Sequence, residues 1–344
     1  MSTDAEPAVP ARRRRNTRRN ILLGVLALFL AAALGSVVFV ANLGHTIDTQ
    51  THKIPEAFPN ETSRPLKPTA GPAAKAMNIL LLGSDSRGDS VDLAEGGDPS
   101  NQRSDIMMWL NIPADRKHLY LMSIMRDTWV DIPGVGPAKI NAAMAYGGVP
   151  LVVQTLEGMF KTRIDHVAIV DFEGFKSITD ALGGVQVNVP LDFTSLHGQF
   201  TFKAGPQKLN GDQALAFVRE RYAFVDGDYQ RVKDQQIFLR AMLNGVLSAA
   251  TLTNPLKVTD LVDKISPYVS VDASLDSGTM GALALSLKSI RGSDVLTFTL
   301  PTLGTGNSAD GQSIVNRDDS AIAGIGKALG NDTLGAYLQS AGLG

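Results

Sequence analysis

Three arginines crowd a short polar stretch between apolar runs, and their charge needs an explanation. The segment VRERYAFVDGDYQRVKDQQ, residues 218–236, contains Arg219, Arg221 and Arg231. Arg219 and Arg221 alternate with Glu220, so on an extended segment both would point to one face while the glutamate points away. A guanidinium is always charged, and its fork matches the oxygens of a phosphate group. The stretch therefore predicts an anion site.

The second half of this stretch has the pattern of a helix start. Asp228 is a suitable N-cap, and an apolar stripe follows to about Ser248. Such a helix would place Arg231 in its first turn, with Gln235 four residues later on the same side. Because helix N-termini favour anions, this helix should support the same anion site as the two arginines before it.

Further charged pairs occur where predicted strands begin or end. They are Asp85 with Arg87, Arg103 with Asp105, Arg126 with Asp127, and the cation Lys139 with Asn141. One such Arg–Asp pair is more often a structural ion pair than a functional group. Four clusters from distant parts of the chain, all at the ends of elements, favour one shared site. Since Mg²⁺ takes one or two carboxylates plus phosphate oxygens, Asp85 and Asp105 are candidate ligands, and the combination predicts a pyrophosphate site.

Strands and helices alternate along the rest of the chain, which predicts a layered α/β/α domain with a central mixed sheet over residues 77–344. We expect strands at 77–83, 106–112, 118–124, 166–170, 185–189 and 295–300. We expect helices at 150–160, from the capping residue Asp171 to Leu182, from Asp228 to about Ser248, and at 281–290, with an extended piece at 201–211.

The N-terminal part differs in composition. Residues 1–20 carry six arginines, and residues 21–43 contain no charge. This pattern predicts a basic cytoplasmic tail, a transmembrane helix at 21–43 and an extracellular body, because basic flanks stay in the cytoplasm. A cleaved signal peptide is the alternative, although its apolar region is usually shorter. Residues 44–76 contain five prolines and read as a linker.

Composition excludes several other classes of protein. The chain of 344 residues has no cysteine, which rules out disulfides and thiolate chemistry. Beyond residue 20 there are 26 basic and 32 acidic residues, so we expect no nucleic-acid binding by the body. Motifs of P-loop nucleotide-binding proteins, serine hydrolases and zinc proteases are missing, and the five histidines are scattered.

The ordered motifs NILLLGSDSR, RSDIMMWLNI, LMSIMRDTWVDIPG, KINAAMAYGG, FEGFKSITDALGGVQVNV and LNGDQALAFVRERY, followed by GDYQRVKDQQ, resemble the LytR-CpsA-Psr family over residues 77–245. The resemblance implies a membrane-anchored phosphotransferase. Such an enzyme moves a cell-wall glycopolymer from a polyprenyl-pyrophosphate carrier onto peptidoglycan, with Mg²⁺ or Mn²⁺, and a pyrophosphatase side activity is possible.

Roles for individual residues follow from the same resemblance. The metal ligands would be Asp85 and Asp105. The pyrophosphate-binding residues would be Arg87, Arg103, Arg126, Arg219, Arg221, Asp228, Arg231 and Gln235. Catalysis would involve Arg126, with Asp127 or Asp105 as the base that takes the proton of the acceptor hydroxyl. An apolar groove for the lipid should lead away from Arg219 and Arg221.

The chain departs from the family pattern at two positions. Met125 stands where many members have proline, and Asp234 stands where an arginine is common. A non-catalytic receptor for lipid-linked wall precursors is the alternative function, because the same arginines would serve it. A transcriptional regulator does not fit, since about 20 residues before the predicted span are too few for a DNA-binding domain.

Overall fold

The computed structural model describes residues 38–84, 104–196, 199–225 and 227–343. The chain divides into two compact units, Met1–His45 and Thr46–Gly344, and the second contains everything discussed below. Among the described residues, no helix is both long and apolar enough to cross a membrane. Most of the predicted span at 21–43 lies outside the described residues, so the membrane anchor remains a prediction.

A mixed sheet of seven strands forms the centre of the second unit, as the sequence predicted. Its order is β1 (His52–Ile54), β12 (Val269–Asp272), β7 (His166–Asp171), β2 (Met77–Ser84), β3 (Ser104–Ile112), β4 (Leu119–Ser123) and β13 (Val295–Thr299). β7, β2, β4 and β13 run in one direction, whereas β3 and β12 run in the other. The carboxyl ends of four strands therefore meet at one edge, where β3 begins.

Alternation along β2 explains how the sheet carries a core on both faces. Leu80 and Leu82 belong to the largest buried cluster, while Ile79 belongs to a second cluster on the opposite face. Successive side chains of a strand point to opposite faces. Leu80 is paired in register with the buried Trp109, so the same face continues onto β3. A strand buried on both faces reads as a continuous apolar run, which made β2 recognisable in the sequence.

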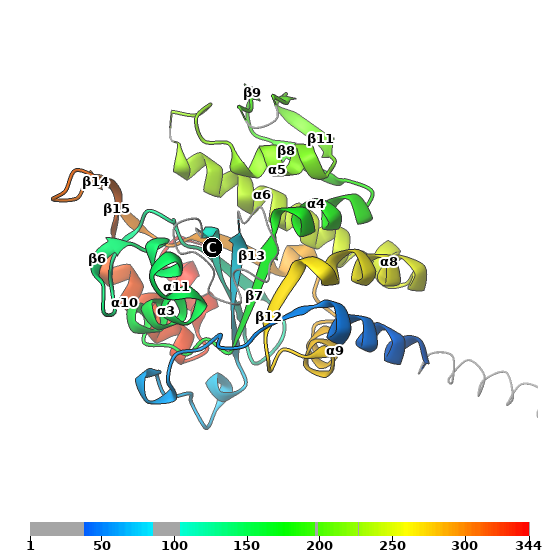
Figure 1. The fold of residues 1–344 in the computed structure, drawn as a ribbon, viewed down its shortest axis with the longest axis horizontal. Helices are drawn as coiled ribbons and strands as arrows, with labels where there is room; N and C mark the ends of the chain where they lie inside the picture. Colours follow the sequence, from blue (N-terminus) through cyan, green and yellow to red (C-terminus); the bar gives the residue numbers. More distant parts are fainter. Residues whose placement is uncertain (1–37, 85–103, 197–198, 226, 344) are drawn as a thin grey trace, which may run out of the picture. The chain divides into compact units, whose positions relative to one another are not determined.

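Helices cover both faces of the sheet (Figure 1). On one side lie α3 (Ala142–Phe160), α10 (Asp319–Gly330) and α11 (Leu334–Ser340); on the other lie α4 (Phe172–Ala181), α6 (Asp228–Val246), α8 (Pro255–Ile265) and α9 (Ser277–Ser286). Shorter helical pieces are α5 (Gly211–Arg219), α7 (Ala249–Leu252), and the 3-10 turns Glu61–Ser63, Pro72–Ala74, Ser266–Tyr268 and Gly292–Asp294. The α/β/α layering predicted from the sequence is confirmed.

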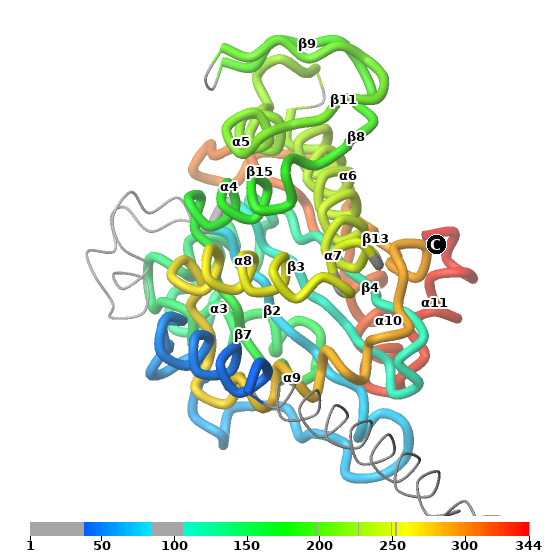
Figure 2. Tube along the Cα trace, turned by 90° about the vertical axis from the view of Figure 1, so that its right-hand side faces the viewer, coloured from blue at the N-terminus to red at the C-terminus, as the bar shows by residue number. Residues whose placement is uncertain are grey.

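Among the described residues, four two-stranded antiparallel sheets stand outside the main sheet, and three of them are hairpins of consecutive strands. They are β5 (Trp129–Ile132) with β6 (Gly136–Lys139), β8 (Val185–Val189) with β11 (Gly205–Leu209), β9 (Phe193–Thr194) with β10 (Thr201–Phe202), and β14 (Thr302–Asn307) with β15 (Ser313–Arg317). Figure 2 shows β8, β9, β11 and α5 together at one end of the unit. A parallel bridge between Thr128 and Val315 joins the β5–β6 hairpin to the β14–β15 hairpin.

Helix boundaries agree with the sequence at two places and differ at two, one of which is α9: expected at 281–290, it runs from Ser277 to Ser286. Asp171 caps α4, its side chain accepting the N–H of Gly174 at 2.7 Å, as predicted. α3 is kinked at Gly147 and Gly148, and its second part runs from the predicted start near residue 150. Asp228 is not the cap of α6, because Gly227 takes that position with φ +50°, a conformation that suits glycine. The carboxylate of Asp228 is used elsewhere.

The predicted linker at 44–76 is folded onto the domain, which corrects the sequence prediction. β1 pairs with β12, and Ile54 is buried in the core. Arg64 is buried and donates from Nε and Nη2 to Glu157 of α3, at 2.7 Å for the shorter Nη2 contact. A buried guanidinium needs such a partner. These contacts pack the segment against the domain, which therefore begins well before residue 77.

Candidate active site

A cavity of about 800 Å³ opens at the edge of the sheet where β4 ends. Arg126 and Asp127 follow β4 and line it, together with Lys139 from the end of β6 and Asp228 from the start of α6. Ligands of open α/β sheets bind beyond the carboxyl ends of strands, so this position agrees with the sequence prediction.

Three guanidinium groups surround the carboxylate of Asp228. Its Oδ2 lies 3.0 Å from Nη2 of Arg231 and 3.8 Å from Nε of Arg126, and its Oδ1 lies 3.5 Å from Nη1 of Arg221. These arginines come from three different places: the end of β4, the loop after α5 and the first turn of α6. Like charges gathered this closely repel one another, so the carboxylate is what holds them in place.

A second carboxylate, Asp127, lies beside this cluster. Nζ of Lys139 is 3.3 Å from its Oδ1, and Nε of Arg126 is 3.7 Å from its Oδ2. Burial alone would raise the pKa of Asp127, but Arg126, Asp228 and Lys139 together lower it. Burial raises the pKa of Asp228; Arg231 opposes the increase, and contact with Asp127 reinforces it. The pKa values of the two carboxyls are thus shifted in opposite directions, and Asp127 is the one that stays ionised.

The charge of this cluster suits an anion with two negative charges. Four cationic side chains surround two carboxylates: Arg126, Arg221, Arg231 and Lys139 face Asp127 and Asp228. Two positive charges remain in excess even when both carboxyls are ionised. The N-terminus of α6 lies at Asp228 and adds its own preference for anions. The arrangement can bind a pyrophosphate and stabilise charge that develops on its oxygens.

Glu220 organises the loop that carries Arg221, a role the sequence did not reveal. Its buried carboxylate accepts backbone N–H groups from Arg221 at 2.9 Å, Tyr222 at 2.7 Å and Ala223 at 3.1 Å on one oxygen. The other oxygen accepts the N–H of Leu196 at 2.7 Å. Burial would raise the pKa of Glu220, but hydrogen bonds from Ser195 and these backbone groups lower it. An ionised acceptor therefore fixes the loop next to the arginine cluster.

Two elements absent from the predicted site form its outer wall. Thr305 of β14 and residues 312–315, which lead into and form β15, line the cavity opposite α3. Tyr229 of α6 contacts Thr302 of β14 through its hydroxyl at 2.9 Å, which ties the hairpin to the arginine-bearing helix. The sequence beyond residue 300 carries no recognisable motif, so only the folded chain identifies this wall.

The structure brings together seven of the residues predicted to form the site and places two others, Arg219 and Gln235, elsewhere. Six of them line the cavity: Arg126, Asp127, Lys139, Asn141, Arg221 and Asp228. The buried Arg231 joins them through its contact with Asp228. Arg219 is the last residue of α5, and its guanidinium stacks on the ring of Phe172 at 4.3 Å. The prediction of an extended segment is therefore wrong. Arg219 ends a helix and Glu220 is its C-cap, so the side chains of Arg219 and Arg221 lie in different surroundings. Gln235 is buried and donates to the carbonyl of Val218 at 3.2 Å, so it holds the end of α5 against α6.

The predicted metal site falls outside the described side chains. Asp85, Arg87 and Arg103 lie outside the described residues, and Asp105 is described only as part of strand β3. Among the side chains that are described, no group of three or more His, Asp or Glu residues is placed to hold a metal ion. The Asp127–Asp228 pair is surrounded by cations, which makes it unsuitable as a metal site.

The region behind Arg219, where we expected an apolar groove, contains a packed cluster of aromatic side chains. Phe193 stacks on Phe202 with ring centroids 4.8 Å apart and meets Phe224 edge-on at the same distance. Phe175 of α4 and Phe238 of α6 are 4.9 Å apart. These side chains belong to a buried apolar cluster between α4, α5, α6 and β8, so the structure shows a packed core here and the open groove expected from the sequence remains a prediction.

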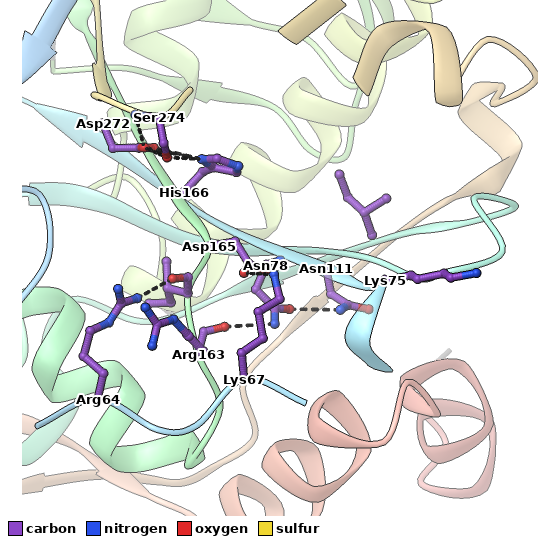
Figure 3. Close-up of polar contacts among 12 residues, drawn as sticks. Arg64, Lys67, Lys75, Asn78, Asn111, Arg163, Asp165, His166, Asp272 and Ser274 are labelled. Carbon is purple, nitrogen blue, oxygen red and sulfur yellow. Dashed lines mark hydrogen bonds and ion pairs between the residues drawn. The ribbon is translucent and has the colours of Figure 1, made fainter. Parts of the chain in front are cut away.

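A second polar cluster resembles a hydrolase triad in composition but not in geometry. His166 Nδ1 lies 3.1 Å from Asp272 and 3.3 Å from the hydroxyl of Ser274 (Figure 3). A triad needs its serine on the ring nitrogen that the acid does not contact, whereas both partners here contact Nδ1. Asp272 also accepts the backbone N–H of Val167 at 3.0 Å. These residues join β7 to β12, so their role is structural.

A profile of the LytR_cpsA_psr family matches residues 40–330. The chain belongs to the LytR-CpsA-Psr family. Among curated relatives it is 31% identical to the cell wall biosynthesis protein LcpA of Corynebacterium glutamicum over 74% of this chain. It is 32% identical to the polyisoprenyl-teichoic acid–peptidoglycan teichoic acid transferase TagU of Enterococcus faecalis, over 74% of this chain and 78% of that protein. The match to LcpA spans just over half of that relative, 56% of its length.

Solved structures of the LytR-CpsA-Psr family share this fold. TagV of B. subtilis superposes with a TM-score of 0.63 and 27% identity, covering 75% of this chain and 97% of TagV. TagT bound to LI-WTA superposes with a TM-score of 0.61 and 26% identity, covering 79% of this chain and 96% of TagT. The resemblance inferred from the motifs is thereby confirmed.

Proposed function

We propose that this chain is a phosphotransferase that moves a glycopolymer from a polyprenyl-pyrophosphate carrier onto peptidoglycan. The observation that carries the proposal is the meeting of three guanidiniums on Asp228: Arg126 and Arg221 line the cavity, and the buried Arg231 contacts Asp228 from behind it. The names of the relatives support it: TagU is named as a transferase of teichoic acid to peptidoglycan, and TagT was solved bound to LI-WTA.

The proposed reaction begins when the pyrophosphate enters the arginine cluster. The guanidiniums bind its oxygens and compete with Asp228, whose raised pKa makes its carboxylate a weaker partner for them. Their forks hold the phosphorus in a fixed orientation, and they already stand where negative charge grows in the transition state. No reorganisation of charge is then required at the moment of reaction.

The acceptor then reacts at the phosphorus that carries the sugar. A hydroxyl of the acceptor forms a new P–O bond while the bond to the bridging oxygen breaks, and polyprenyl phosphate leaves with the electron pair. Asp127 accepts the hydroxyl proton, because its lowered pKa keeps it ionised at neutral pH. Lys139, 3.3 Å from Asp127, holds the carboxylate in place. No covalent intermediate on the protein is needed.

A divalent cation is part of the proposal. Asp85 and Asp105 would hold Mg²⁺ or Mn²⁺, which would neutralise phosphate oxygens that the arginines do not reach. Residues 21–43 would anchor the protein in the cell membrane as a single pass, with the N-terminus in the cytoplasm and the body outside. The carrier lipid would enter the apolar layer between α4, α5 and α6, where aromatic side chains must give way.

The experiment that tests this function measures release of polyprenyl phosphate. The purified full chain in detergent is incubated with Mg²⁺, a polyprenyl-pyrophosphate glycan and peptidoglycan, and the products are identified by mass spectrometry. A transferase releases polyprenyl phosphate and leaves the glycan joined to peptidoglycan through a phosphodiester. A receptor binds the carrier and releases nothing, and that outcome would establish the alternative function.

A further inference from the structure

A second groove of about 470 Å³ lies beside the candidate active site, formed by the same two hairpins. The β5–β6 hairpin contributes Trp129, Asp131 and Pro137, and the β14–β15 hairpin contributes Leu303, Asn316 and Arg317. Nothing in the mechanism above uses these residues. We infer that this groove binds the glycan strand of the peptidoglycan acceptor, an inference that rests on the proposed transferase function.

Strand register makes the groove continuous with the active site. Trp129 pairs with Lys139, and Asp131 pairs with Pro137, across the antiparallel hairpin. Residues directly opposite each other point to the same face, about 5 Å apart at their Cβ atoms. This face is the outer one, because the alternate residues Val130 and Ile132 are buried in the core. Trp129 is thus one cross-strand step from Lys139, whose ammonium group contacts Asp127.

The β14–β15 hairpin lines both the active-site cavity and the groove. Ser313 and Ile314 of β15 line the active-site cavity, whereas Asn316 and Arg317 of the same strand line the groove. The backbone N–H of Val315 donates to the carbonyl of Asp127 at 2.9 Å, which fixes the hairpin to the strand end that carries the proposed base. A chain lying in the groove therefore approaches the reaction centre on the side of Asp127.

The chemistry of the groove fits a sugar chain. Trp129 is only partly buried, and with Leu303 and Pro137 it offers an apolar surface for the C–H face of a sugar ring. Asp131 and Asn316 supply side chains that hydrogen-bond to hydroxyl and amide groups. Apolar walls with a few polar groups that fix orientation are what small-molecule sites use.

Charge and position favour the acceptor strand over the donor polymer. Arg317 is already paired with Asp319 at 2.7 Å, so together with Asp131 the groove has no excess positive charge and would repel a polyanion. The donor's pyrophosphate is held on the arginine side of the cavity, whereas the attacking hydroxyl must reach Asp127. A glycan strand bound at Trp129 therefore approaches the phosphorus from the side of the cavity on which Asp127 lies.

Direct binding can be measured without turnover. The chain has two tryptophans, and Trp109 is only 1% exposed, so a quencher such as acrylamide acts on Trp129. Adding soluble, uncrosslinked peptidoglycan strands to the full-length protein in detergent should protect Trp129 from acrylamide. Protection should be lost in a variant in which Asp131 and Asn316 are both alanine. Unchanged quenching of the wild-type protein at saturating strands would overturn the inference.

Kinetics separate this inference from the proposed function. Trp129→Ala should raise the KM for the peptidoglycan acceptor about tenfold while the KM for the donor keeps its value, and Trp129→Tyr should restore acceptor binding. His118→Ala is the control, since His118 lines a different cavity of about 850 Å³ at the opposite end of β4. An increase in donor KM alone would assign the groove to the donor and overturn the inference. Binding of strands by a protein that never releases polyprenyl phosphate would overturn the function but leave this groove in place.

Discussion

Replacing Asp234 by asparagine should stabilise the protein, and the gain should grow as the pH rises. Asp234 is fully buried in α6. One carboxylate oxygen accepts a hydrogen bond from Gln230 at 2.9 Å, and the other has no hydrogen-bond partner among the described residues. Burial raises the pKa of Asp234 to about 7, and Gln230 and Lys233 only partly oppose this.

The sign and size of the effect follow from linkage. A carboxyl whose pKa is raised in the folded state favours folding below its unfolded pKa of 3.8, and this advantage is lost as the pH rises through about 7. Each unit of difference corresponds to about 1.4 kcal/mol, so a charged Asp234 costs the folded state about 4 kcal/mol at pH 8. At pH 5 the cost is smaller, about 2 kcal/mol.

Urea unfolding of the full chain in detergent, followed by circular dichroism at pH 5 and pH 8, measures this difference. Asp234→Asn keeps the acceptor for Gln230 and removes the charge, so its advantage over the wild type should be about 2–3 kcal/mol larger at pH 8 than at pH 5. Asp263→Asn is the control, because Asp263 is exposed on α8 and should give no such difference. An advantage that is equal at both pH values would refute the buried-carboxyl reasoning.

Three further predictions concern the loop, the metal and the membrane. Glu220→Gln should lower the free energy of unfolding by about 1–3 kcal/mol and raise the donor KM, because one carboxylate oxygen that accepts a backbone N–H becomes a donor; urea unfolding and steady-state kinetics measure both, and unchanged values would show that the loop does not depend on it. Asp85→Asn and Asp105→Asn should each weaken Mn²⁺ binding, measured by calorimetry, and lower turnover; variants with wild-type metal dependence would remove these residues from the metal site. Protease added to intact, wall-stripped cells should digest residues 44–344, and full protection would contradict the proposed topology.

Strand ends were the most predictable part of the site. Short apolar runs closed by polar residues fixed β2, β4 and β7, and because carboxyl ends share one edge, Arg126 and Asp127 could be placed near the other charged residues. The Asp171 cap was equally local. These features depend on neighbouring residues, which a single sequence contains.

Other features depended on signals that were present but weak. Asn210 and Gln213 form a capping box at the start of α5, and the apolar positions that follow continue the helix to Arg219. That pattern would have shown that Arg219 is helical and that it diverges from Arg221. Asp310 and Gly311 mark the turn between β14 and β15, the hairpin that completes the cavity wall.

The remaining features arise from contacts between distant parts of the chain. The prolines of residues 44–76 indicate a linker, yet Arg64 pairs with Glu157, 93 residues away, and draws the segment onto the domain. The bridge between Thr128 and Val315 likewise joins hairpins that are far apart in sequence. No local pattern encodes such partners, and only the folded chain brings them together.

The central claim is that the guanidinium cluster on Asp228 binds the pyrophosphate of a lipid-linked glycan and drives transfer. The most direct test compares release of polyprenyl phosphate by the wild type, Arg221→Lys and Arg240→Lys in the full-length protein. Lysine keeps the charge at residue 221 but loses the planar fork, so release should fall about 10²–10³-fold. Arg240 is exposed on the same helix and donates to Thr297 at 3.1 Å, away from the Asp228 cluster, so its variant should keep wild-type turnover. Equal release by all three proteins would contradict the account.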